Sequence, residues 1–445
     1  MLFTFGTSLL AAFLFGLIPA WKTAKAEIHE TLKESGRGGS GARHRAQIAI
    51  VAVEMALALV LLTGAGLMIR SLGYLWNVKP GFDPQNVMKM EVAAAEPLGK
   101  TPADIRASLR KFQTVLAGVP GVEAASLNGG ATPMSGDSEL PVWLDSEPKP
   151  VTEADMKVSL FYLVQPDYLK IMKTPLKRGR FLEERDDEKS PFVVVIDEEF
   201  AKRFFGDKDP IGRHVNFDIL NVSGEIVGVV GHVKQWGMDE GSSNQIQAQC
   251  YLPLAQLPDS LMSLFAHGFP ALVRFNPTML SNVTPIRQAL WSVNGQLVVY
   301  DTKMMTEIVS DSLSLKRFAM TLLGIFAALA TLLSCVGIYG VVSYIAGQRT
   351  QEIGIRMAMG AERKDILRMM LGEAGRMALV GVGVGLVASF LLMRLISSML
   401  FGVSTHDPVT FCAVAMLLTL VALTACLIPA QRATRVDPVV ALRYE

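Results

Sequence analysis

Five long apolar runs limit the folds open to this chain. Each is close to the ~20 residues that a helix needs to cross a bilayer. Half of the 445 residues are hydrophobic and only 19% are charged, which fits several membrane spans plus a water-exposed domain better than one soluble globule. The runs are residues 2–20, 48–70, 318–346, 376–400 and 408–430. We therefore expect an α-helical transmembrane bundle of about five spans in a lipid bilayer.

Lysine and arginine in the links set the expected orientation. The links 21–47 and 347–375 are rich in both residues, whereas the short turn 401–407 has neither. Because basic links stay in the cytoplasm, the turn is expected to face outward. The same threading places residues 71–317 outside and the tail 431–445 inside. The sequence thus predicts a multi-pass protein with a large extracytoplasmic domain inserted between spans.

The first run has the apolar core of a signal peptide but the wrong flanks. No positive residue precedes it, and Trp21, Lys22 and Lys25 follow it. We therefore predict a retained span at 2–20.

The two ends of the chain contain an internal repeat. Residues 17–33, LIPAWKTAKAEIHETLK, align without gaps on residues 427–443, LIPAQRATRVDPVVALR. Residues 1–33 are then expected to be the last span and tail of a preceding module. Residues 34–47 are expected to be a flexible basic linker. This reading makes the chain the second half of a duplicated protein, whether split or truncated.

The long middle, residues 71–317, carries the patterns of a mixed α and β domain, and we expect two α+β subdomains. Its strand candidates have alternating or β-branched residues between turn residues, and lie at 86–92, 122–128, 157–164, 191–196, 224–233, 250–254, 271–275 and 296–301. Its helix candidates lie at 102–118, 166–173, 197–206 and 284–294.

The link 347–375 begins with a stretch typical of an amphipathic surface helix, residues 347–360. Glu352 and Arg356 stand i,i+4, where opposite charges support a helix. Ile353, Ile355, Met357 and Met359 supply apolar contacts. The alternative is a solvated loop that only satisfies the positive-inside rule.

Several strings resemble those of MacB-type, FtsX-like ABC transporter permeases, most closely the acidobacterial duplicated permease group, of which this chain would be the C-terminal module. They are QRTQEIGIRMAMGA at 348–361, LLGIFAALATLLSCVGIYGVVSYIA at 322–346, PGFDPQNV at 80–87 and VVVIDEEFAKRFFGDKDPIGRHV at 193–215. The resemblance covers nearly everything from residue 46 onward. It identifies residues 71–317 as a MacB-like periplasmic core domain and places the chain in the bacterial inner membrane.

The resemblance implies a permease that relays motion from a separate P-loop ATPase subunit to its periplasmic domain. The cargo would be a macrolide-like compound, a peptide or a lipoprotein, and an upstream half or a second copy would complete the assembly. The implied ATPase-coupling residues are Arg349, Glu352, Ile353, Gly354, Ile355, Arg356 and Met359. A non-transporting regulator of a cell-wall enzyme is the alternative.

Other motifs argue against chemistry in this chain. No GxxxxGK[ST] string follows a strand, so ATP hydrolysis is expected elsewhere, and the chain is not expected to be an enzyme. GVGVG at 381–385 predicts close helix packing rather than a dinucleotide site. His214, His232 and His267 have no metal-ligand spacing, and no cofactor, metal or nucleic acid is expected.

Three further expectations concern single segments. Glu54, a carboxyl group inside a span, is a candidate functional residue. The acidic block EERDDE at 183–188 is expected to be a solvated surface loop rather than an acid/base pair. The helical pattern that starts at Met304 enters the third span without Pro or Gly before Gly324, which predicts a continuous rod; a helix merely tethered there is the alternative.

Overall fold

The computed structural model describes Gly6 and residues 40–135, 138–152, 155–240, 246–277 and 283–433. The predicted span at 2–20, and most of the predicted terminal repeat, lie outside the described residues. The chain divides into two compact units. We call residues 72–318 the head domain, and the rest of the described chain the membrane unit.

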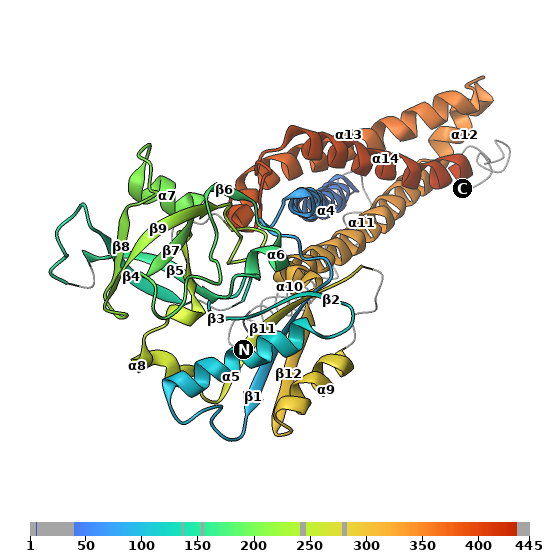
Figure 1. The fold of residues 1–445 in the computed structure, drawn as a ribbon. Coiled ribbons are helices and arrows are strands. Elements are labelled where there is room, and N and C mark those ends of the chain that lie inside the picture. Colours follow the sequence, from blue (N-terminus) through green and yellow to red (C-terminus); the bar gives the residue numbers. More distant parts are fainter. Residues whose placement is uncertain are drawn as a thin grey trace. The chain divides into compact units, whose positions relative to one another are not determined.

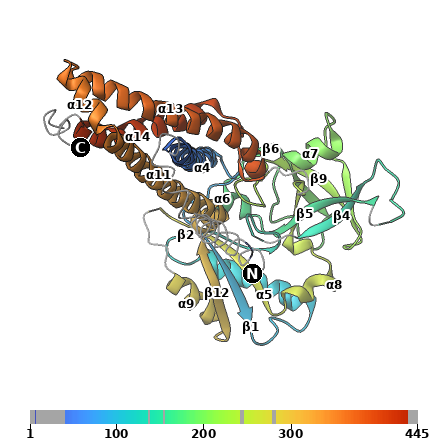
Figure 2. The same cartoon turned by 180° about the vertical axis from the view of Figure 1, so that it is seen from behind.

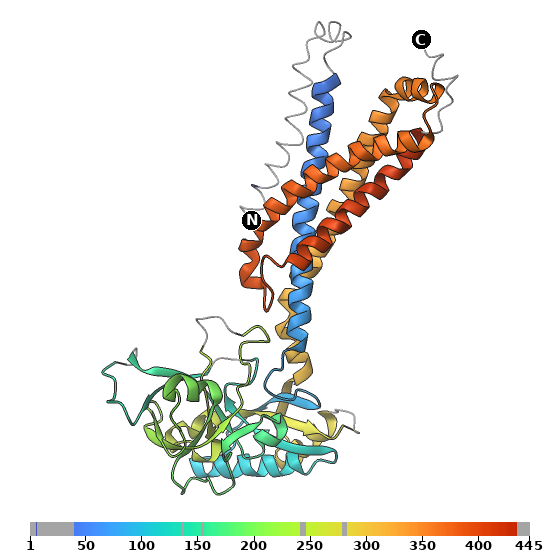
Figure 3. The ribbon, with the colours of Figure 1, turned by 90° about the horizontal axis from the view of Figure 1, so that it is seen from above.

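The membrane unit contains four helices that are long and apolar enough to cross a bilayer, among the described residues. Figure 3 shows them running alongside one another. They are α4 (Ser40–Asn77), α11 (Ser314–Gln348), α13 (Arg363–Leu392) and α14 (Pro408–Ala433). Of these, α4 is the most buried, because the other three all pack against its apolar side chains. A helical bundle with α4 at its centre is therefore the framework of this unit.

Two helix boundaries differ from the predicted ones. Helix α4 begins at Ser40, so part of the predicted linker 34–47 is helical. Helix α13 begins at Arg363 rather than at residue 376, because Glu362 and Asp365 form a capping box that starts the helix within the basic link. Arg363 and the following charged residues thus belong to the first turns of a span, which hydropathy alone does not reveal.

The predicted rod from Met304 is interrupted. Helix α10 (Met305–Ser312) ends at Leu313, and α11 starts at Ser314. Leu313 keeps a near-helical backbone, with φ −98° and ψ −1°, and its N–H bonds to the carbonyl oxygen of Ser310. The expectation of one unbroken helix is wrong at this residue, whereas α11 itself runs without a break through 35 residues.

The head domain contains a four-stranded antiparallel sheet in the order β12-β1-β11-β2. The strands are β1 (Val87–Ala94), β2 (Val122–Leu127), β11 (Gly268–Phe275) and β12 (Leu297–Met304). Helices α5 (Pro102–Ala117) and α9 (Val283–Val293) contact each other and lie on the same side of the sheet (Figures 1 and 2). Thr101 caps α5, and its apolar side chains at Ile105, Leu109 and Phe112 repeat on the buried face.

A second, eight-stranded sheet closes on itself. Its pairings run β10-β7-β9-β8-β4-β5 and return from β5 to β10, with β3 and β6 attached to the ring. Closure leaves these six strands no free edge. The strands are β3 (Gly129–Gly130), β4 (Glu139–Leu144), β5 (Lys157–Val164), β6 (Leu176–Gly179), β7 (Val193–Asp197), β8 (His214–Phe217), β9 (Val222–Val230) and β10 (Gln249–Pro253).

Short helices complete the head domain. They are α6 (Tyr168–Met172), α7 (Glu198–Phe205), α8 (Asp259–Met262) and the 3₁₀ turns η3 (Leu254–Gln256) and η4 (Ser263–Phe265). All eight predicted strands and all four predicted helices of this domain are present, which confirms the α+β expectation.

Candidate functional site

Helix α12 (Thr350–Ala358) forms within the predicted surface stretch and is followed at Gly360 by a left-handed turn with φ 97°. Ile353 is fully buried and packs with Ile366, Met370 and Ala430 of the membrane unit. This contact anchors one face of α12 to the bundle. Ile353 was expected among the ATPase-coupling residues, but its side chain is already occupied by the bundle core.

Other side chains of α12 are exposed, although Arg356 also contacts Met369 Sδ of α13 at 2.7 Å. Arg356 donates to Glu352 at 2.5 Å, and Arg349 lies 4.0 Å from the same carboxylate. Beside this charged pair, Ile355 is 41% and Met359 77% exposed. We define Glu352, Ile355, Arg356 and Met359 as the α12 surface. Gly354 lies within the helix, and Arg349 and Met359 stand at its two ends.

The α12 surface lies at one end of the bundle, and the turn 401–407 lies at the other. Arg70, near the end of α4, forms an ion pair with Asp407, and the backbone N–H of Phe401 donates to Ser71 at 2.8 Å. Helix α11 runs antiparallel to α4, since Leu323 lies near Gly64 and Gly337 lies near Glu54. Both connections to the head domain therefore leave the bundle at the end that carries the turn.

Small residues bring α13 close to α4. A Cβ atom at Gly381 would lie 2.7 Å from the Met55 Cβ, and one at Gly385 would lie 3.0 Å from the Ala56 Cα, whereas Gly383 faces open space. The GVGVG string is thus a helix-packing seam, as predicted.

Glu54 lies on α4 against α11. A Cβ atom on Gly337 would come within 2.4 Å of its Oε2 atom, which is buried and has no hydrogen-bond partner among the described residues. A function for Glu54 stays a prediction.

The head domain holds a buried ionic cluster that the sequence did not reveal. His232 Nδ1 lies 2.6 Å from Asp197 Oδ2, and His232 Nε2 lies 3.6 Å from Glu240 Oε1. Burial lowers the pKa of His232, but the hydrogen bond to Asp197 and the nearby Glu240 carboxylate outweigh it and raise that pKa to about 10. Asp197 also accepts from the backbone N–H groups of Phe200 and Gln249. His232, for which no role was expected, is thus a structural cation.

The acidic block 183–188 is a surface loop, as expected, but Asp186 within it is buried. Arg180 donates to both oxygens of Asp186, at 2.7 and 2.9 Å, and the Asp186 carboxylate also accepts from the N–H of Glu183. The alternating charges predicted solvation, but a bidentate arginine compensates the burial of Asp186.

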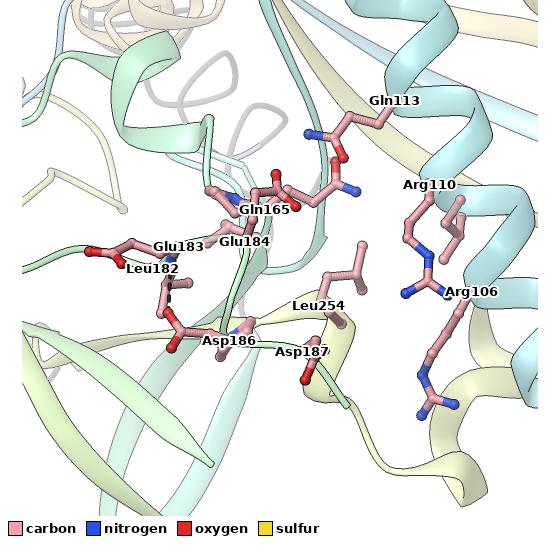
Figure 4. A pocket seen from close by; sticks show the side chains of 15 residues that line it. Arg106, Arg110, Gln113, Gln165, Leu182, Glu183, Glu184, Asp186, Asp187 and Leu254 are labelled. Atoms are coloured by element: carbon pink, nitrogen blue, oxygen red, sulfur yellow. Dashed lines mark hydrogen bonds between the residues drawn. The ribbon is translucent and has the colours of Figure 1, made fainter. Parts of the chain in front are cut away.

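Figure 4 shows this block facing Arg106 and Arg110 of α5 across a small polar pocket of about 70 Å³. Arg106 lies 2.6 Å from Asp259, and Arg110 lies 3.2 Å from Glu188. The pocket has room for only a few waters. It is a polar seam that joins α5 to the segments around the second sheet. Among the described residues, no group of three His, Cys, Asp or Glu side chains is arranged to hold a metal ion.

Two family models match this chain. The MacB-like periplasmic core domain matches residues 48–279, more than half of the chain, and the FtsX-like permease C-terminal domain matches residues 324–438. The chain belongs to the FtsX-like permeases with a MacB-like periplasmic core domain. Its transmembrane bundle and large α+β domain are the two parts of this family's architecture.

Curated relatives carry export names. The "Pyoverdine export ATP-binding/permease protein PvdT" of Pseudomonas syringae pv. tomato is 29% identical over 62% of this chain and 41% of its own length. The "Macrolide export ATP-binding/permease protein MacB" of Wolinella succinogenes is 27% identical over 62% of this chain and 42% of its own length. The chain thus matches less than half the length of these relatives.

A crystal structure of the periplasmic region of MacB from Actinobacillus actinomycetemcomitans is also similar to this chain. The identity is 17% and the TM-score 0.34, over 51% of this chain and 93% of that one.

Proposed function

We propose that this FtsX-like permease is the membrane subunit of an efflux-type ABC transporter in the bacterial inner membrane. An ATPase on a separate polypeptide docks on the α12 surface in the cytoplasm, and its motion passes through the bundle to the head domain in the periplasm. The export names of the relatives favour export over regulation of a cell-wall enzyme. An upstream permease half or a second copy of this chain completes the assembly.

The observation that carries this proposal is the two-sided character of α12. Its buried face fixes the helix to the bundle through Ile353, so a force on the helix reaches α13 and α14. Outside that face, Met359 is 77% exposed beside the Glu352–Arg356 pair. An exposed methionine bordered by charged side chains is typical of a protein docking site.

The proposal is tested by copurification with the cell's P-loop ATPases from native membranes. Ile355→Glu puts a charge on the apolar part of the α12 surface, and we expect the ATPase to be lost. The double variant Glu352→Arg/Arg356→Glu keeps an opposite-charge pair at i,i+4 but inverts the charges offered to a partner. We expect it to fold normally and also to lose the ATPase.

Glu362→Gln is the control, because this residue caps α13 outside the α12 surface. Docking on α12 is wrong if both α12 variants retain the ATPase at the wild-type level.

A further inference from the structure

The head domain contains a second, much larger cavity, of about 650 Å³, apart from the polar seam. Strands of both sheets line it: β1 and β11 on one side, β4 and β5 on the other. The volume lies within the 300–1,000 Å³ typical of small-molecule sites.

The wall of this cavity is mainly apolar. Phe161 and Leu163 of β5 contribute to it, as do Leu261, Leu264 and Phe265 from the segment after β10. Leu264 is 72% exposed. Exposed apolar surface of this kind in a folded domain commonly marks a binding site.

Close backbone packing shapes one part of the wall. A Cβ atom on Gly129 would lie 2.5 Å from the ring of Phe265, and one on Gly130 would lie 2.5 Å from the carbonyl oxygen of Phe161. Gly130 also has a backbone φ of 71°, which residues other than glycine rarely adopt. Because Gly129 and Gly130 have no side chains, Phe265 and Phe161 pack directly against the backbone of β3. This packing shapes the wall of the cavity.

The charged groups on the wall are of one sign. Glu91 and Glu139 line the cavity together with His267, and no lysine or arginine is among its described lining residues. Lys89 lies 3.5 Å from Glu91 and offsets that charge. Glu139, exposed at the start of β4, has no ion pair among the described residues. The wall thus presents one uncompensated carboxylate beside a large apolar surface.

We propose that this cavity binds a small cationic amphiphile, with the apolar body against Leu264 and the aromatic rings and the positive group beside Glu139. This inference rests on the proposed function, since it names the chemical class of the exported substrate. Charge complementarity selects an amine over a fatty acid, and the apolar wall selects an amphiphile over a polar cation.

Binding is measured by fluorescence on the purified full chain in non-ionic detergent, with empty micelles as the blank. The probe is a dansyl-labelled long-chain amine, compared with a dansyl-labelled fatty acid and a neutral dansyl-labelled alkane of the same chain length. We expect the amine to bind at least about tenfold more tightly than either.

Two variants test the geometry. Glu139→Gln should weaken the amine about fivefold, the size expected for one partly exposed charge pair, and leave the neutral probe unchanged. Leu264→Arg places a cation on the exposed wall and should weaken the amine more than about tenfold. The matched controls are Glu123→Gln and Val151→Arg, both at exposed positions outside the cavity lining, and they should bind like the wild type.

The proposal is overturned if the three probes bind the wild type equally, or if Glu139→Gln and Leu264→Arg bind the amine as tightly as the wild type. The ATPase experiment separates this outcome from failure of the proposed function. The cavity variants should keep the ATPase, and Ile355→Glu should keep the amine. Loss of amine selectivity with intact ATPase docking therefore refutes the ligand alone.

Discussion

Asp197 is a buried carboxylate that connects several elements around the second sheet. It ends β7, caps α7 through the N–H of Phe200, accepts from the N–H of Gln249 on β10, and contacts His232. Burial raises the pKa of Asp197, while the His232 cation lowers it. Since Asp197 is fully buried, its charge needs that cation.

We expect His232→Gln to lower the free energy of unfolding of the head domain by about 3 kcal/mol at pH 7, because it leaves Asp197 and Glu240 without a cation. Denaturation followed by tryptophan fluorescence in detergent measures this. His214→Gln is the control, since His214 is exposed on β8. If His232→Gln lowers the free energy of unfolding no more than His214→Gln does, the cluster contributes little to stability.

The pH dependence of this effect has a fixed sign. The pKa of His232 rises from 6.5 to about 10 on folding, so the stability that its charge contributes is complete below pH 6.5 and is lost as the pH passes through about 10. The gap in unfolding free energy between wild type and His232→Gln should therefore shrink between pH 7 and pH 10. A gap that stays constant over this range would contradict the assigned protonation.

At the scale of elements, the contact between α4 and α13 depends on Gly381 and Gly385, which face α4. Gly385 faces the backbone of α4, whereas Gly383, on the same helix, has open space around it. We expect Gly385→Ala to destabilise the bundle by about 1–3 kcal/mol, because the backbone of α4 cannot move aside as a side chain can. Gly383→Ala should be neutral or slightly stabilising, since alanine favours a helix.

Thermal melting of the detergent-purified variants, followed by circular dichroism, distinguishes these outcomes. Equal melting temperatures for Gly385→Ala and Gly383→Ala would mean that the seam does not limit the approach of the two helices.

The elements that sequence reasoning found are those with strong local patterns. The buried run Val193–Ile196 and the capped helix after Thr101 are examples. Four strands were missed. β4 and β8 have alternating buried residues over only six and four positions, whereas β3 is two glycines and all four residues of β6 are exposed. Strands β3 and β6 exist because their partners β5 and β9 pair with them, and a single sequence does not record that pairing.

The candidate site could be predicted only in part, for the same reason. Helical spacing predicted α12 and its Glu352–Arg356 pair, but it could not separate Ile353, which is buried, from Ile355, which is exposed. The His232 cluster joins residues 35 positions apart and has no sequence signature. Likewise, the cavity near Glu139 arises only when both sheets are in place.

At the scale of the whole molecule, the account requires that the head domain and α12 lie on opposite sides of the membrane. Both connections to the head domain leave the bundle at the end that carries the turn 401–407, and α12 lies at the other end. Exposed apolar side chains on α11, α13 and α14 lie between the two ends. An ATPase in the cytoplasm and a ligand in the periplasm can act on this one chain only if α12 and the head domain lie on opposite sides of the membrane.

The most direct test is labelling of intact spheroplasts with a membrane-impermeant maleimide. Lys189→Cys and Arg363→Cys place single new thiols on the exposed surfaces of the head domain and of the first turn of α13. Wild type is the control for background labelling, because Cys250 and Cys426 are buried but Cys412 is exposed near the start of α14. We predict that Lys189→Cys is labelled from outside and Arg363→Cys only after permeabilisation, whereas the reverse result would contradict the account.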